Sequence, residues 1–510
     1  MNTLRQPYNE TFMRTSLQAA MSAINLYSEY FLGLIISLTI ARNLSTDDYG
    51  VYSSIIWLAG LITLAINSGL AINVTKFVAE FAKREPESLP AILSYFWRIQ
   101  HVRVLLVLIV AFTLLFINSS NANVDVWVLC LLFICAVIKA DYMFRMAVLK
   151  GIKRYDVLAK TSVITNPFNI AAVLFCAYYD ASLSNFVLVY CSACLVYGAS
   201  ARLFTKELPD SKWDDATVDN HKKRILSQML SATGIVFLGA LIFKQSQVIV
   251  LEQSSFFSEA GFFNIGFLLS TAAITLIPGI YQEILLPKIT DAVQNGDVKG
   301  QVEQAERYLI TLSLLVAIPV ALYADVIINL LYGERYEGAV FCLQVMIMLK
   351  AIMTLNQGAN LTLISHDKQI GMVKINAVMF IIAVVLSLLC VPYLGLDGAL
   401  IVYGVLVFIL LISYSYLAKS CNYKMLPTKD LLRIVIPALI SSAAILLVNY
   451  FLSGIVAMMV GSLLFAIIYV NLLFIFKGYD KSVNVIIKQI KPKAPLFVQN
   501  YMEWALRQLA

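Results

Sequence analysis

Three lysines lie inside long apolar stretches of this 510-residue chain, at Lys139, Lys244 and Lys350. An ammonium group at the centre of a bilayer costs on the order of 2.5 to 3.5 kcal/mol even on lenient insertion scales. Such side chains therefore face a wet cavity or an opposite charge. Because lysine is an effective point-charge partner for phosphate, a cavity lined by these residues would attract an anion such as a diphosphate.

Two of these lysines occupy the same position in an internal repeat. The segment DDYGVYSSI around Gly50 is similar to SEAGFFNIG around Gly261, and the same offset of 211 residues relates Lys139 to Lys350. Weak similarity at a long fixed offset in a hydrophobic chain is typical of transporters built from two related bundles. The alternative is that Lys139 pairs with Asp141 or a neighbouring helix, and that both repeat lysines reach toward the cytoplasmic interface.

Four further charged residues are candidates for the same site. Arg98 and Arg103 open the third apolar stretch and could bind a phosphate headgroup at the inner leaflet. The alternative, which the positive-inside rule favours for most basic residues here, is that they are ordinary cytoplasmic residues. Glu29, in the first apolar stretch, is a candidate for proton coupling or for an ion pair with a cavity lysine, and Asp141 is a second carboxylate with these two possible roles.

The elements that must position these residues are membrane-spanning helices. Hydrophobic residues make up 60% of the chain and charged residues 14%, with a mean hydropathy of +0.79. A soluble protein needs a more charged surface than this. The apolar runs are about 20 residues long, which as helix crosses a hydrocarbon core of about 30 Å. Short alternating segments of the barrel type are absent from the sequence.

We expect about fourteen such helices. The first six lie near 17–41, 51–78, 92–117, 125–147, 157–178 and 182–203. Six more repeat this plan near 226–251, 257–286, 305–331, 338–363, 370–391 and 398–418, and two without a counterpart follow near 431–452 and 455–476. Because each repeat holds an even number of spans, the two are related by an axis along the membrane normal.

The predicted fold is therefore an all-α membrane protein with two six-helix lobes and two additional C-terminal helices. The expected parts are an N-terminal segment 1–16, a first lobe 17–203, a charged linker 204–225, a second lobe 226–418, the additional helices 431–476 and a basic tail 477–510. Lys and Arg alternate between successive loops, which places both termini in the cytoplasm. The net charge of +7 then reflects topology rather than nucleic-acid binding.

Several chemistries find no support in the sequence. There is no G-x-x-x-x-G-K-[ST] loop for nucleotide hydrolysis, and the three histidines are too scattered to ligate a metal. Cys191 and Cys194 form a C-x-x-C inside an apolar stretch, which we interpret as two small helix residues. No cleavable signal peptide is expected, because the polar start leads into a full-length span. The predicted outer loops are too short for the active site of a glycosyl ligase or polymerase. We therefore expect no enzyme activity, cofactor or metal.

Several segments together resemble a known family. IARNLSTDDYGVYSSI, VLKGIKRYDVLAK and EAGFFNIGFLLS are similar to the polysaccharide-exporter branch of the multidrug/oligosaccharidyl-lipid/polysaccharide (MOP) superfamily, which contains the Wzx-type O-antigen flippases. The resemblance implies a MATE-like fold with a V-shaped cavity between two lobes. It also implies transfer of an undecaprenyl-diphosphate-linked oligosaccharide from the inner to the outer leaflet of the bacterial inner membrane, for lipopolysaccharide-type surface glycan. The implied partners are this lipid-linked saccharide, membrane lipids and the polysaccharide polymerase machinery.

The seventh predicted span departs from this resemblance. Similar proteins often carry an acidic residue near its end, where this chain has Lys244, Gln245 and Gln247, with Glu252 at the edge. The coupling ion is therefore left open, and Lys244 is consistent with an anionic cargo. Two alternatives within the superfamily are a cation-coupled multidrug and toxin extruder, which would need cavity carboxylates, and a lipid II flippase, which also suits a cationic cavity. A membrane glycosyltransferase is an alternative of a different class.

Overall fold

The computed structural model describes residues 32–117, 126–152, 154–179, 181–205, 214–274 and 298–478. Every regular element within these ranges is a helix. Glu29, the N-terminal segment 1–16 and nearly all of the tail 477–510 lie outside the described residues. What the sequence predicts for them stays a prediction.

Membrane-spanning helices dominate the described part of the chain. Ten helices there are long and apolar enough to cross a bilayer, or eleven if the bent pair Ala339–Met353 and Asn356–Ser365 forms one span. This composition confirms the predicted all-α membrane fold. The total of fourteen helices stays a prediction.

The chain divides into two compact units, Met1–Gly261 and Phe262–Ala510. The repeat instead predicts a boundary between the two lobes within 204–225. The seventh predicted span, 226–251, therefore lies in the first compact unit and not with the second lobe. The two boundaries differ because the compact units are defined by contacts in space, whereas the predicted lobes are defined by similarity between two parts of the sequence. The boundaries of the repeat stay a prediction.

The first unit is a bundle of helices in which α5 is central, because α5 packs against α2, α3 and α7. After a helix at Leu32–Asn43, its elements are α2 (Thr46–Asn67), α3 (Leu70–Arg84), α4 (Leu89–Ile117), α5 (Val126–Gly151), α6 (Tyr155–Tyr179), α7 (Leu183–Phe204), α8 (Asp215–Ala240) and α9 (Ser246–Gln253). A π-helical turn, η2 (Leu241–Gln245), joins α8 to α9. The central place of α5 puts Lys139 within the bundle.

The second predicted span, 51–78, is broken between α2 and α3. Gly69 lies at the break with a φ of +68°, a backbone conformation that favours glycine. A Cβ at this position would overlap the backbone of Thr233 on α8. The break is therefore fixed by contact with a distant helix, which the apolar pattern of 51–78 does not reveal.

The two repeated segments touch one another inside the first unit. Ser258 donates a hydrogen bond to Asp47 on α2, and these residues stand 211 positions apart, the offset of the repeat. Gly50 lies so close to the carbonyl group of Phe257 that a Cβ would overlap it, and Gly261 packs against Gly50. Glycine thus lets the first turn of α2 meet the start of the helix Phe257–Ile274 at backbone contact.

Part of the predicted linker 204–225 is an ordered helix. Residues 215–225 form the first turns of α8, and Arg224 donates to both carboxylate oxygens of Glu80 on α3, at 2.8 and 2.9 Å. Val218 and Ile225 are buried against α3 and α4. These turns are therefore anchored to the bundle rather than free.

The second unit contains α11 (Val298–Leu322), α12 (Ala324–Leu331), α13 (Ala339–Met353), α14 (Asn356–Ser365), α15 (Gln369–Ala418), α16 (Thr428–Phe451) and α17 (Gly454–Ile475). α15 combines the predicted spans 370–391 and 398–418 across a kink at Gly395, where φ is +54°. The predicted span 338–363 is bent by 42° between α13 and α14. Thr354 lies at this bend, and its hydroxyl donates to the carbonyl oxygen of Ala351 at 2.6 Å, a local bond that bends helices.

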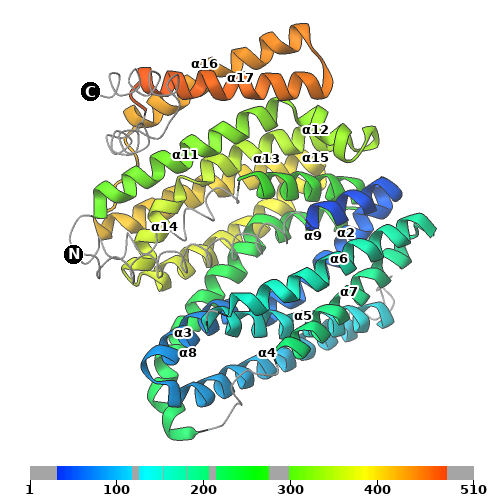
Figure 1. The fold of residues 1–510 in the computed structure, drawn as a ribbon, viewed down its shortest axis with the longest axis vertical. Coiled ribbons are helices and arrows are strands. Elements are labelled where there is room, and N and C mark those ends of the chain that lie inside the picture. The colour runs from blue at the N-terminus through cyan, green and yellow to red at the C-terminus, as the bar shows by residue number, and fades with distance from the viewer. Residues whose placement is uncertain are drawn as a thin grey trace, which may run out of the picture. The chain divides into compact units, whose positions relative to one another are not determined.

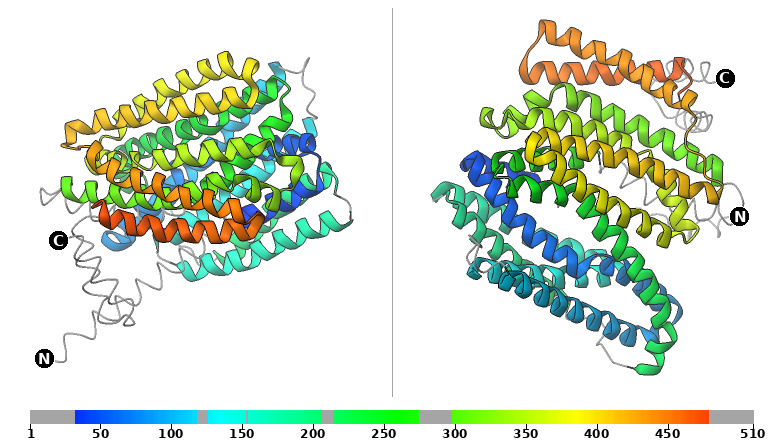
Figure 2. Two further views of the ribbon diagram at one scale, coloured as in Figure 1. Left: turned by 90° about the horizontal axis from the view of Figure 1, so that it is seen from above. Right: turned by 180° about the vertical axis from the view of Figure 1, so that it is seen from behind.

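The last two helices form an antiparallel pair that lies side by side in each view (Figures 1 and 2). Tyr323, between α11 and α12, donates to the carbonyl oxygen of Ala457 on α17 at 2.7 Å. Phe465 and Tyr469 stack within the same core, with ring centroids 5.6 Å apart. The two additional C-terminal helices therefore share a hydrophobic core with the rest of the second unit.

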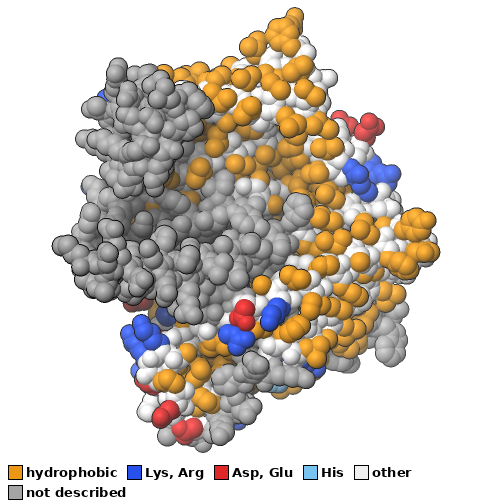
Figure 3. Space-filling view, viewed as in Figure 1, with side chains coloured by type: hydrophobic (Ala, Val, Ile, Leu, Met, Phe, Trp, Pro, Cys, Tyr) orange, Lys and Arg blue, Asp and Glu red, His pale blue; other side chains and the backbone are white. Residues whose placement is uncertain are grey.

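Hydrophobic side chains cover much of the described surface, as the space-filling view shows (Figure 3). On α16, Leu446 and Leu447 are 62% and 63% exposed, and on α15 Ile412 is 68% exposed. A soluble protein rarely leaves so many large apolar side chains in water. These helix faces are suited to contact lipid.

Candidate functional site

Lys350 lies in the last turn of α13 and is only 9% exposed. Its Nζ donates to Oγ1 of Thr271 at 2.6 Å and stands 3.8 Å from the ring centroid of Phe267. Both of these partners are uncharged. A buried ammonium over an aromatic face is stabilised by the ring quadrupole.

Lys139, the repeat counterpart, also lies over an aromatic ring. Its Nζ is 5.6 Å from the ring centroid of Tyr190 on α7. Asp141 is occupied elsewhere, because it accepts from Arg145 at 3.2 Å and pairs with Arg202 at 3.7 Å. The two arginines therefore supply the ion pairs of Asp141, which the sequence also allowed Lys139 to make.

Lys244 lies in the π-helical turn η2. Such turns free a backbone carbonyl and are frequent at functional sites. Here Nε2 of Gln247 donates to the carbonyl oxygen of Ile242 at 3.0 Å. Oε1 of the fully buried Gln247 makes no hydrogen bond among the described residues. Lys244 in the turn is thus followed, three residues later on α9, by a buried amide oxygen without a hydrogen bond among the described residues.

Arg103 holds the break between α2 and α3. Its guanidinium donates to the carbonyl oxygens of Ser68 at 2.8 Å and Ile66 at 3.3 Å, and to Oγ1 of Thr233 at 2.8 Å. These bonds satisfy carbonyl groups that the broken helix leaves without a partner. The arrangement gives Arg103 a structural task, and a role in substrate binding stays a prediction.

The remaining cationic candidate, Arg98, is exposed on α4. Next to it on the same helix, Trp97 lies under the guanidinium of Arg145, 5.0 Å from the ring centroid. Nη1 of Arg145 also donates to Oγ1 of Thr205 at 3.1 Å. Arg145 is therefore held by Asp141, Trp97 and Thr205.

Glu306 on α11 is a functional candidate that the sequence does not single out. It is fully buried, and its carboxylate accepts from the hydroxyl of Tyr423 at 2.5 Å and from the backbone N–H of Leu426 at 3.1 Å. In sequence it stands at the start of the predicted span 305–331, where an acidic residue is ordinary. The sequence does not single out Thr271 and Phe267 either, because hydroxyl and aromatic residues are common in spans.

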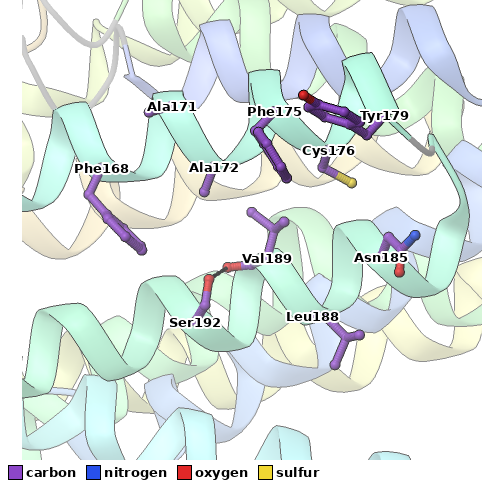
Figure 4. Close-up of a pocket in the computed structure, with 10 residues that line it drawn as sticks. All are labelled: Phe168, Ala171, Ala172, Phe175, Cys176, Tyr179, Asn185, Leu188, Val189 and Ser192. Atoms are coloured by element: carbon purple, nitrogen blue, oxygen red, sulfur yellow. Dashed lines mark hydrogen bonds between the residues drawn. The ribbon is translucent and has the colours of Figure 1, made fainter.

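A groove of about 630 Å³ lies between α6 and α7 in the first unit (Figure 4). Phe168 and Phe175 of α6 line it on one side, and Leu188 and Val189 of α7 on the other. Ser192 donates to the carbonyl oxygen of Val189 at 2.8 Å and so presents little polarity to the groove. An apolar groove of this kind suits a hydrocarbon chain rather than a charged group.

Among the described residues, no group of three or more His, Cys, Asp and Glu side chains could hold a metal ion. The eight cysteines, Cys191 and Cys194 included, are free thiols. The candidate site therefore rests on the lysines and their neutral neighbours.

The comparisons with known proteins agree with this architecture. A family model described as "Polysaccharide biosynthesis protein" matches residues 39–341. The chain is similar in structure to the lipid II flippase MurJ in an inward closed conformation, with a TM-score of 0.61 and 16% identity over 90% of this chain and 98% of that one. It is also similar to an inward-facing MATE family transporter of the MOP superfamily, with a TM-score of 0.57 and 12% identity over 77% of this chain and 94% of that one.

A mutant of the Vibrio cholerae MATE transporter VcmN is similar to the same degree, with a TM-score of 0.57 and 14% identity over 81% of this chain and 97% of that one. At such identities the likeness establishes the fold, which is MATE-like. No curated protein matches the chain in sequence.

Proposed function

Because the chain belongs to the polysaccharide biosynthesis protein family, we propose that it is a flippase of the MOP superfamily for a lipid-linked oligosaccharide. The proposed cargo is an undecaprenyl-diphosphate-linked saccharide that crosses the bacterial inner membrane for O-antigen-like surface glycan. Alternating access requires no covalent step, so the site residues bind the cargo and do not react with it. Cytoplasmic termini and a polysaccharide polymerase as partner belong to the same proposal.

The environment of Lys350 carries this proposal. Its ammonium is buried, donates to the hydroxyl of Thr271 and lies over the ring of Phe267. A transporter of organic cations would gain nothing from such a group, because like charges repel in a low-dielectric site. A diphosphate, in contrast, gains a charge-assisted hydrogen bond.

Lys139 is proposed as the corresponding group of the first unit, and Lys244 as a third contact. Asp141 is proposed as a structural ion-pair partner of Arg145 and Arg202 rather than a coupling carboxylate. This leaves the two repeat lysines with aromatic neighbours of the same kind. Glu29 stays a candidate for coupling.

A lipid II flippase is the second candidate function. It is supported by the similarity to MurJ, which extends over 90% of this chain. Its cargo would share the diphosphate and differ in the sugar. The same lysines would therefore serve both cargoes, and the two functions separate only in the glycan that is lost.

The deciding experiment locates the lipid-linked saccharide in cells that lack the gene. We expect undecaprenyl-diphosphate saccharide to accumulate on the inner leaflet while the surface polysaccharide disappears. Variants K139A and K350A should reproduce the defect at normal protein levels. K76A is the matched control, because Lys76 on α3 also lies over a ring, at 5.8 Å from Phe77, but is exposed and donates to Gln228 at 2.8 Å.

Three other results would change the conclusion. Arrested cell-wall synthesis with normal surface polysaccharide would favour the lipid II flippase. Normal lipid and glycan pools with increased sensitivity to cationic drugs would favour the extruder. Detectable glycosyl transfer by the purified protein would identify a membrane enzyme.

A further inference from the structure

The carboxylate of Glu306 occupies a confined position within the second unit. Its oxygens accept from Tyr423 and from the backbone of Leu426, both in the connection between α15 and α16. These donors come from the chain more than a hundred residues away and hold the carboxylate in one orientation. Because two donors fix both oxygens, the group can act as a rigid surface for whatever packs against it.

Gly358 of α14 is what packs against it. A Cβ at this glycine would overlap Oε1 of Glu306 and crowd the rest of its carboxyl group. Only a residue without a side chain lets the first turn of α14 lie this close to the carboxylate. The contact therefore sets the position of α14 relative to α11 by steric fit.

The start of α14 is linked directly to Lys350. α14 follows α13 after a bend of 42°, and Lys350 is in the last turn of α13. At the bend, the N–H of Thr354 donates to the carbonyl oxygen of Lys350 and to that of Ala351, both at 3.2 Å. A shift of α14 would thus be transmitted through Thr354 to the backbone that carries the lysine.

We propose that Glu306 is a positioning residue for Lys350, which it acts on by buttressing Gly358 and so fixing the bend between α13 and α14. The ammonium is then held over Phe267 and at hydrogen-bond distance from Thr271. This inference deepens the proposed function, on which it rests only for the identity of the anion. The effect of Glu306 on the position of Lys350 can be measured in the protein without substrate.

The first test measures this geometry without substrate. The rate at which acetic anhydride acetylates Lys350 is followed by mass spectrometry in the purified full-length protein. A displaced, more accessible lysine reacts faster, so E306A, which removes the buttress, and G358A, which overlaps it, should each increase the rate about tenfold. E306Q keeps the volume of the buttress and should stay within about twofold of the wild type.

Glu303 provides the matched control one turn earlier on the same helix. It pairs with Arg307 at 3.1 Å and contacts no residue of the bend among its hydrogen bonds and ion pairs. E303Q should therefore leave the acetylation rate unchanged. In the double variant E306A/G358A, the methyl group added at position 358 meets no carboxylate. Lys350 of the double variant should therefore be acetylated no faster than Lys350 of E306A.

The second test measures binding of undecaprenyl diphosphate by the same variants in nanodiscs. We expect E306A and G358A to bind about tenfold more weakly, and E306A/K350A to bind no more weakly than K350A. If the variants label as expected but the wild type binds no lipid diphosphate, the proposed function fails and the positioning role stands. If E306A and G358A label like the wild type, or if E303Q labels as fast as they do, the positioning role is refuted. Should E306A fail to fold, the comparison of G358A with wild type decides.

Discussion

Replacing Lys350 by methionine should weaken the binding of a lipid diphosphate while it spares the fold. Methionine keeps an unbranched side chain of similar reach and removes the charge. Two unit charges 4 Å apart interact by about 4 kcal/mol at an effective dielectric constant of about 20, which is an upper bound for the loss. Hydrogen bonds to charged groups measure about 1.5 to 3 kcal/mol, so we expect K350M to bind about 10- to 150-fold more weakly.

Although K350M should bind the lipid diphosphate more weakly, it should be at least as stable to thermal unfolding as the wild type. Burial of the wild-type ammonium, which is 9% exposed, costs desolvation free energy that methionine does not incur. Thr271 keeps a hydrogen bond in the variant, because its hydroxyl also donates to the carbonyl oxygen of Phe267 at 2.5 Å. The thermal midpoint is therefore expected to stay the same or to rise.

The assay titrates undecaprenyl diphosphate into nanodiscs that hold the purified protein, at low and at high salt. K350R, which keeps the charge, should retain more affinity than K350M, and K76M should bind like the wild type. If K350M bound within about threefold of the wild type, or lost affinity only in proportion to a lower thermal midpoint, the reasoning from charge would be wrong.

Three further predictions concern the first unit. G69A should lower the unfolding free energy by more than about 1 kcal/mol in thermal or denaturant unfolding, because φ is +68° there and a Cβ overlaps Thr233; an unchanged midpoint would contradict this. R103K should lower the unfolding free energy by about 1 to 3 kcal/mol in the same measurement, because one ammonium cannot make all the hydrogen bonds that the guanidinium makes at the break between α2 and α3. Equal stability of R103K and the wild type would argue against this structural role of Arg103. Burial raises the pKa of Glu252, which lies beyond the span Thr217–Lys244 and accepts from Ser54. The folded state therefore binds this proton more tightly than the unfolded state, so wild-type stability relative to E252Q should rise as pH falls toward the ordinary carboxyl range; a difference that is independent of pH would refute it.

The sequence by itself determines the class of this protein and the outline of its fold. Apolar runs long enough to cross a bilayer can be read from local composition, because the hydrophobic effect acts on each segment separately. The predicted spans 431–452 and 455–476 correspond closely to α16 and α17. The repeat offset also relates Lys139 to Lys350, and the structure gives both an aromatic neighbour.

The tertiary structure alone decides where spans break and which polar groups meet. The break at Gly69 depends on Thr233, and the position of Glu306 depends on Tyr423, 117 residues away in the chain. No local pattern encodes such pairs, because close packing and hydrogen bonding depend on distances that exist only after the helices have assembled. The sequence therefore places Lys350 within a predicted span, and the packing of Thr271, Phe267 and the bend beside Gly358 determines the surroundings of its ammonium.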